Sequence, residues 1–160
     1  MSQRAPQVSQ FGSVDPAPPS KLGDIETWKH SLVDEEIPLF QRMRNVFALR
    51  NEGSDDSCLA LCFGFESKSA LLRHELAYVL GQMQNKVAIP SLIERLDDVN
   101  EHVMVRHEAA EAMGAIGDIS VKAMLQKHLT DDNPEVSESC EVALDLLAWC
   151  NTDEWKETKW

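Results

Sequence analysis

A ten-residue pattern that occurs twice constrains the fold of this chain of 160 residues more than any other feature. The first copy covers residues 72–81 and reads LRHELAYVLG; the second covers residues 105–114 and reads VRHEAAEAMG. The two copies are offset by 33 residues throughout. Because a repeat of this length is typical of stacked helical pairs that bury their apolar sides against one another, the sequence predicts an all-α solenoid, or α-α superhelix.

Each copy predicts a helix whose histidine lies away from the apolar stripe. At about 100° per residue, His74 and His107 lie almost opposite their stripes, whereas Glu75 and Glu108 lie at the edges. We expect the small neighbours of each histidine to leave room for a ligand: Ala77 and Gly81 in the first copy, Ala110 and Gly114 in the second. The stripes, which we expect to form the core, are Leu72, Leu76, Val79, Leu80 and Met83, and Val105, Ala109, Ala112, Met113 and Ile116.

The repeated His-Glu pair suggests a metal site. Packed helices lie about 8 to 10 Å apart, so equivalent residues of consecutive repeats face one groove, where two imidazoles and a carboxylate can close around an ion. Imidazole and carboxylate ligands without thiolate suit iron and leave positions open for oxygen and substrate. The alternative is a surface dipeptide that was copied with the repeat and has no function.

The composition favours some partners over others. The formal net charge is -12, and no stripe of Lys and Arg is present, so nucleic acid is disfavoured as a partner. A cationic partner such as an amine-bearing side chain is favoured, although the acidity alone is also compatible with a role in solubility. No apolar run approaches the roughly 18 residues of a membrane span, and the first twenty residues lack the layout of a signal peptide, so we expect a cytoplasmic protein that does not enter a membrane.

The chain divides into three predicted parts. Residues 1–22 form a polar, Pro-rich connector that is expected to be disordered or extended, 23–150 form the repeat domain, and 151–160 form a frayed polar tail in which Trp155 packs back. The four cysteines fit no zinc pattern and are expected to be free buried thiols. The repeat domain is predicted to contain four helix pairs, at 24–33 with 39–50, 57–65 with 69–83, 87–96 with 103–116, and 120–129 with 134–149.

The outer pairs lack the His-Glu motif and are expected to cap the repeat array. In the first pair Arg42 and its neighbours occupy the motif position, and in the fourth pair Glu138 and Ser139 do. Arg73 and Arg106 share one helical phase and are predicted to bridge repeats. Two further histidines, His30 and His128, are expected at solvent-facing or helix-end positions. His102 precedes His107 by five residues, and a position near the groove is a disfavoured alternative for it.

Three segments of the chain resemble deoxyhypusine hydroxylase: residues 69–83, 104–118 and 138–145, within a similarity that runs from residue 13 to about residue 149. The resemblance implies HEAT-like helical repeats and a site for two irons. It further implies the hydroxylation of deoxyhypusine, the modified lysine of the translation factor called initiation factor 5A, to give hypusine.

The resemblance also implies roles for the two motifs. His74, His107 and Glu108 would be ligands of one iron. Glu75 would be either a further ligand or a carboxylate beside the ligands, and would act in catalysis by orienting the cationic substrate.

Residues 13–19 resemble the connector between the two halves of the family, so the chain looks like this connector followed by the C-terminal half, with two of four His-Glu pairs. We therefore expect one iron, and a site completed either by the missing N-terminal half or by a second copy. A fragment of a longer hydroxylase is favoured over a dimerising half-enzyme. One alternative is a helical-repeat scaffold without metal. A second alternative, a HEAT-repeat lyase that attaches bilin pigments, is disfavoured by the Pro-rich connector and by the two motifs.

Overall fold

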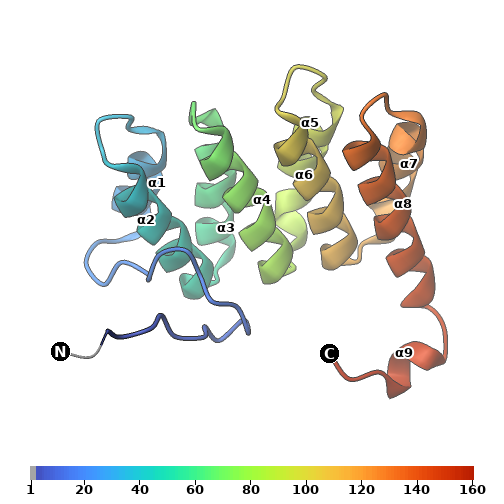
Figure 1. The fold of residues 1–160 in the computed structure, drawn as a ribbon, viewed down its shortest axis with the longest axis horizontal. Helices are drawn as coiled ribbons and strands as arrows, with labels where there is room; N and C mark the ends of the chain where they lie inside the picture. The colour runs from blue at the N-terminus through green and yellow to red at the C-terminus, as the bar shows by residue number, and fades with distance from the viewer. Residues whose placement is uncertain (1–2) are drawn as a thin grey trace.

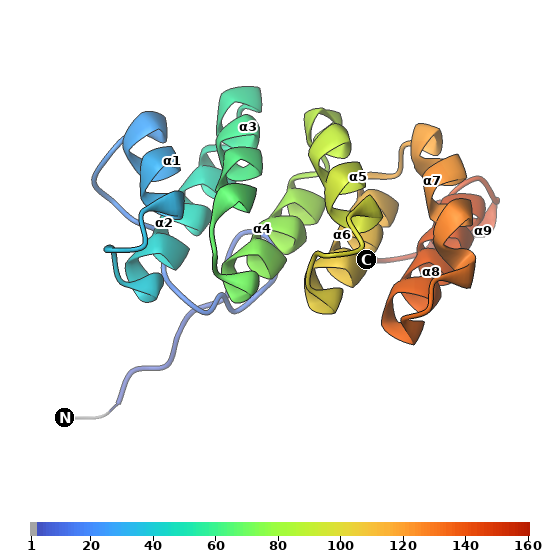
Figure 2. The same ribbon diagram turned by 90° about the horizontal axis from the view of Figure 1, so that it is seen from above.

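The structure is a computed structural model that describes residues 3–160, and it consists of helix pairs stacked in a row (Figure 1). One layer contains α1 (Ile25–Val33), α3 (Asp55–Phe63), α5 (Ile89–Asp97) and α7 (Lys122–Lys127). The other layer contains α2 (Leu39–Glu52), α4 (Ala70–Met83), α6 (Val103–Ile116) and α8 (Pro134–Trp149). Figure 2 shows these two layers side by side. The predicted all-α solenoid of four helix pairs is confirmed.

The helices begin and end at residues that suit those positions. The Ser69 side chain caps α4 by accepting a hydrogen bond from the Leu72 amide at 3.1 Å, as the sequence suggests. Pro134 opens α8, where its missing amide hydrogen is not needed. Gly53 and Gly117 end α2 and α6 with positive φ angles of 80° and 75°, a backbone conformation that glycine adopts without strain.

Short 3-10 turns adjoin α3, α5 and α7 of the first layer, and they make α5 and α7 shorter than the sequence predicts. These turns are η1 (Gly64–Glu66), η2 (Lys86–Ala88), η3 (Ile119–Val121) and η4 (His128–Thr130). Apart from one isolated bridge between Val8 and Val14, residues 3–160 contain no β-structure. None of the helices in this described part of the chain has the length and apolar character needed to cross a bilayer.

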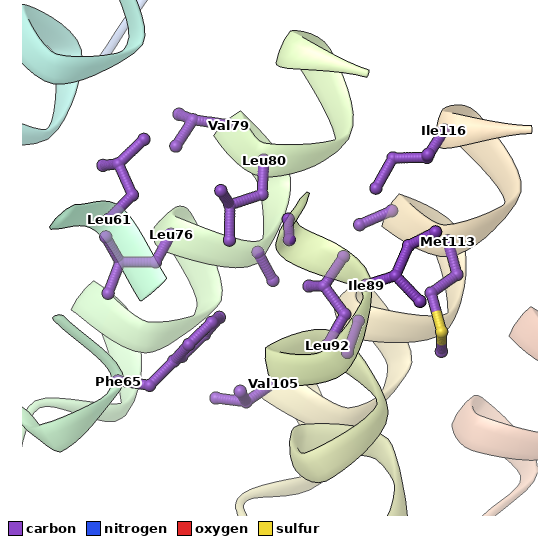
Figure 3. Packing of buried hydrophobic residues seen from close by; sticks show 14 of the residues in the cluster. Leu61, Phe65, Leu76, Val79, Leu80, Ile89, Leu92, Val105, Met113 and Ile116 are labelled. Atoms are coloured by element: carbon purple, nitrogen blue, oxygen red, sulfur yellow. The ribbon is translucent and has the colours of Figure 1, made fainter. Parts of the chain in front are cut away.

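The core lies between the two layers and contains the predicted apolar stripes (Figure 3). Leu72, Leu76 and Leu80 of α4 are fully buried, and so are Val105 and Met113 of α6. Removing one such side chain from water contributes about 1.5 to 3 kcal/mol. Burial of the stripes leaves the opposite sides of α4 and α6 free to carry polar groups.

The small residues beside the histidines have a different role from the predicted one. A Cβ atom on Gly81 would lie 3.1 Å from the Cα of Ala112, and one on Gly114 would lie 3.0 Å from the Cα of Ala143. Ala77 and Ala110, which share these faces, are fully buried. The expectation that these residues leave room for a ligand was wrong, because they instead allow α4, α6 and α8 to approach closely.

Arginines at one helical phase connect consecutive repeats, as predicted. The Arg73 side chain donates to Glu101, which precedes α6, with the shortest N–O distance at 2.7 Å. Arg106 makes the equivalent pair with Asp131, which precedes α8, at 2.6 Å. Each pair ties an inner helix to the loop before the next one.

The chain before α1 lies against the first two repeats. Asp15 accepts two hydrogen bonds, at 3.0 and 2.7 Å, from Arg50 of α2, whose side chain is fully buried. The Arg50 guanidinium also lies 4.4 Å from the ring centre of Phe11 and donates to Gln82 of α4 at 2.8 Å. These contacts order the extended segment before α1. The division of the chain at residues 22 and 150 stays a prediction.

The C-terminal tail differs in detail from the expectation. It contains a short helix, α9 (Glu154–Glu157), rather than frayed chain alone. Trp155 has 43% of its surface exposed, whereas the Trp160 ring meets Trp149 edge to face at 5.7 Å between centroids. The expectation that Trp155 packs back was wrong, because Trp155 lies on the exposed helix α9 and Trp160 makes the aromatic contact with Trp149.

Candidate metal centre

Two neighbouring helices bring together three of the four residues predicted as metal ligands. His74 lies on α4, and His107 and Glu108 lie on α6. The His74 Nε2 atom is 3.2 Å from a Glu108 carboxylate oxygen, and the two imidazole ring centres are 5.9 Å apart at an interplanar angle of 42°. One ligand atom from each of the three residues lies within 4.8 Å of the others. The geometry therefore permits a shared ion.

The surroundings of the three side chains suit a cation. The side chains of His74 and His107 are about one quarter exposed, at 25% and 28%, and Glu108 is buried. The hydrogen bond to Glu108 raises the pKa of His74, while partial burial opposes this shift. The Nδ1 atom of His74 is buried without a hydrogen-bond partner. A buried nitrogen without a hydrogen-bond partner is uncommon in proteins. Two imidazoles and a carboxylate together form a donor set that suits a first-row transition metal.

Glu75, the fourth predicted residue, is not a member of this three-residue cluster. Burial raises the pKa of its carboxyl group, and the neighbouring charge of His74 opposes that shift. The negative charges of Glu108 and Asp15 raise this pKa further, and Arg50 lowers it. Glu75 is thus within electrostatic reach of both the cluster and the Asp15–Arg50 pair, and its role stays a prediction.

An acidic recess of about 290 Å³ lies beside His107, between α6 and α8. Glu111 in this recess is 3.5 Å from the His107 Nδ1 atom and accepts a hydrogen bond from Ser139 at 3.2 Å. Sequence reasoning missed Glu111 as a candidate, although its spacing of four residues from His107 places the two side chains together on a helix. The other lining residues are Glu135, Glu138 and Val142.

The remaining histidines lie outside the cluster. His30 is exposed, and His102 caps α6 by accepting a hydrogen bond from the Met104 amide at 3.2 Å. His128 lies at a helix end, as expected, but is buried, with ring nitrogens 2.9 Å from Asp97 and 3.2 Å from Asp131.

All four cysteines are free, as predicted. The predicted burial holds for Cys58 and Cys140 and was wrong for Cys62 and Cys150, which are partly exposed.

The repeat architecture is recognised independently by comparison with protein families. Residues 60–145 match the family model for HEAT repeats, which is more than half of the chain. The chain therefore belongs to the HEAT-repeat proteins.

Within this class the similar proteins are deoxyhypusine hydroxylases, as the sequence motifs predict. The chain is 48% identical to the Candida albicans enzyme in an alignment of 152 positions that covers 92% of this chain and 48% of the relative. It is 49% identical to the Homo sapiens enzyme, with 88% of this chain and 47% of the relative covered. The Oryza sativa subsp. japonica deoxyhypusine hydroxylase-B is 49% identical, with 89% and 47% covered.

The fold agrees with this relationship. The structure of human deoxyhypusine hydroxylase in complex with glycerol superimposes with a TM-score of 0.86 and 48% sequence identity, over 90% of this chain and 50% of that chain. The predicted resemblance to the hydroxylase family is confirmed. The chain spans about half the length of the curated relatives it matches.

Proposed function

We propose that this chain takes part in hypusine biosynthesis, as one half of an iron-dependent deoxyhypusine monooxygenase. The observation that carries this proposal is the convergence of His74, His107 and Glu108, from two consecutive repeats, in a chain related to deoxyhypusine hydroxylases. The protein substrate would be the translation factor called initiation factor 5A, which carries deoxyhypusine. A cytoplasmic location is part of the same proposal.

The three clustered residues would hold one ferrous ion. Their donor atoms already lie within 4.8 Å of one another, and the unpartnered Nδ1 atom of His74 shows that one imidazole is not fully satisfied by protein groups. When bound, the iron would supply the activation of dioxygen for insertion of one oxygen atom into a carbon–hydrogen bond. The protein would fix the ligands through the buried packing of α4 against α6.

The carboxylates around the cluster would bind and orient the substrate amine. Glu75 is the predicted residue for this role, and its partial burial strengthens an interaction with a cation that displaces water. The recess beside His107 contributes two further carboxylates, Glu111 of α6 and Glu138 of α8. An ammonium group on a flexible side chain is therefore the substrate chemistry that this surface favours.

Two His-Glu pairs supply ligands for one iron, whereas the family resemblance implies four pairs and two irons. An N-terminal half of the kind that the resemblance implies, or a second copy of this chain, would supply the other ligands. Residues 13–19 would then serve as the connector between the halves, and the chain would correspond to the C-terminal half.

Reconstitution of activity tests the proposal. The chain is mixed with the N-terminal half of a related hydroxylase, ferrous iron and a translation factor carrying deoxyhypusine, and hypusine is measured by amino-acid analysis. We expect hypusine from the mixture but not from either half, and no hypusine when His107→Ala replaces the wild-type chain. Absence of product from a mixture whose halves are shown to associate would contradict the proposed activity.

The second candidate function is a metal-free repeat scaffold that binds a partner in its groove. HEAT repeats serve unrelated functions, so the fold alone does not exclude this role. The feature against it is the convergence of both motif copies, since a scaffold has no need for two imidazoles beside one carboxylate. Metal binding by the isolated chain separates the two candidates.

A further inference from the structure

Helix α3 has an exposed apolar side in addition to its buried one. Cys58 and Leu61 face the core and are fully buried. Leu59 and Phe63, four residues apart and thus neighbours on the helix surface, have 52% and 37% of their surfaces exposed. A helix that is apolar on all sides is normally covered on all sides. Within the described residues, Lys29 and His30 of α1 border Phe63 on this outer side, and more than half of the Leu59 surface is left uncovered.

A groove of about 760 Å³ follows this exposed side, in the layer that contains α1, α3 and α5 (Figure 2). Leu59 and Phe63 line it together with Ile25 of α1 and Ser91 of α5. We refer to it as the α3 groove. It lies on the layer opposite to α4 and α6, which carry the His74–His107–Glu108 cluster, so an occupant would not cover the candidate metal centre.

The rim of the α3 groove is acidic. Four carboxylates from four different elements line it: Glu26 of α1, Asp56 of α3, Glu66 of η1 and Glu94 of α5. The single cation is Lys29, whose ammonium nitrogen lies 3.9 Å from Glu26 and 5.0 Å from the Phe63 ring centre. In the described part of the chain, the carboxylates of Asp56, Glu66 and Glu94 make no ion pair.

We propose that the α3 groove binds a basic amphipathic helix of a partner protein. Apolar side chains of the partner would lie on Leu59 and Phe63, and its Lys or Arg residues would pair with the carboxylates of Asp56 and Glu94. An apolar floor with charged borders is the arrangement by which grooves bind amphipathic helices, where apolar residues anchor and charges select the partner. This inference is independent of the proposed hydroxylase activity.

A designed peptide tests the proposal. The probe is a fluorescein-labelled Leu/Lys peptide of roughly 18 residues with its leucines on one helical face, and the control has the same composition with the leucines distributed around the helix. We expect the probe to bind at least about tenfold more tightly than the control, because the groove contacts the apolar face of the probe in addition to attracting its charge. Fluorescence anisotropy at physiological salt measures both affinities.

Variants of the chain locate the binding site. The double variant Leu59→Ser, Phe63→Ser should weaken probe binding about tenfold or more, as loss of an apolar anchor does. Glu94→Lys should weaken it as well, and provides an independent test if the double variant fails to fold. The matched control is Val99→Ser with Ile119→Ser, at two residues that are 76% and 63% exposed outside the groove.

Three results would overturn the proposal. Equal binding of both peptides would show attraction by charge alone. Unchanged probe binding by folded Leu59→Ser, Phe63→Ser protein would place the site elsewhere. Failure to bind the probe, combined with dimerisation that this double variant abolishes in sedimentation experiments, would show that a second copy of the chain covers the face.

Discussion

Largely buried ion pairs between an arginine and a carboxylate connect the repeats of this protein. The Arg106 side chain is 2% exposed and the Asp131 side chain is 10% exposed, and the two side chains meet directly before α8. Removing one member of such a pair leaves the other charge buried without compensation, which costs more than the pair contributes in net stability. The neighbouring Asp132 is exposed and makes no such pair in the described chain.

We therefore expect Asp131→Asn to lower the free energy of unfolding by about 2 to 4 kcal/mol. Asp132→Asn, the matched control, should change it by less than about 0.5 kcal/mol. Urea denaturation followed by circular dichroism measures both values. Equal effects of the two variants would show that the Arg106 contact does not stabilise the fold.

The same pair predicts a pH dependence. Hydrogen bonds from Arg106 hold the pKa of Asp131 well below its usual range, against the opposing effect of burial. A depressed folded-state pKa means that the stabilisation is complete above the unfolded-state pKa of about 3.9. It is lost progressively as the pH falls from there to the folded-state pKa, so part of it is lost by pH 3. Wild-type protein should thus lose more stability than Asp131→Asn between pH 6 and pH 3, as measured by urea titrations at each pH. Parallel curves would contradict this assignment.

At the scale of the secondary-structure elements, the main feature is the close contact of neighbouring helices at small residues. The periodic pattern predicted the helices, their caps and their buried stripes, because these depend on neighbours within one or two turns. It did not predict that Gly81 and Gly114 lie against the next helix. Whether a small residue leaves room for a ligand or for a neighbouring helix depends on where that helix lies. It also missed the contact of Asp15 with Arg50, since no periodicity links residues 35 positions apart.

The contact between α6 and α8 can be tested at Gly114. Gly114→Ala would place a Cβ atom 2.9 Å from the Cβ of Ala143. We expect destabilisation of about 1 to 3 kcal/mol, although alanine alone favours a helix by about 1 kcal/mol over glycine. Adding Ala143→Gly should recover part of the loss, in a double-mutant cycle measured by urea unfolding. Additive effects of the two substitutions would show that the helices do not meet here.

Within the segment before α1, Arg50 binds Asp15 and lies over the ring of Phe11. Arg50→Lys retains the charge but loses the planar donor group that binds both oxygens of Asp15. We expect faster hydrogen exchange in residues 11–15, measured by mass spectrometry, and little change there for Arg44→Lys, whose side chain binds only the carbonyls of Pro18 and Pro19 from an exposed position. Identical exchange in both variants would contradict the anchoring role of Arg50.

At the scale of the whole molecule, repetition of the helix pair creates the candidate site. Neither repeat contains the site alone, because His74 comes from one repeat and His107 and Glu108 from the next. The duplicated motif was sufficient to predict this juxtaposition. The exclusion of Glu75 from the cluster depends on how α4 and α6 stack, which no short sequence pattern encodes. The contact of Glu111 with His107 depends only on their four-residue spacing within α6, so the sequence carried a signal for it.

The most direct test of the account is the iron content of the purified chain after anaerobic loading with ferrous iron and removal of unbound metal. We predict about one iron per chain by elemental analysis, near zero for His107→Ala, and the wild-type value for His30→Ala, which removes an exposed histidine outside the cluster. Equal iron retention by wild type and folded His107→Ala would contradict the assignment of His74, His107 and Glu108 as a metal centre.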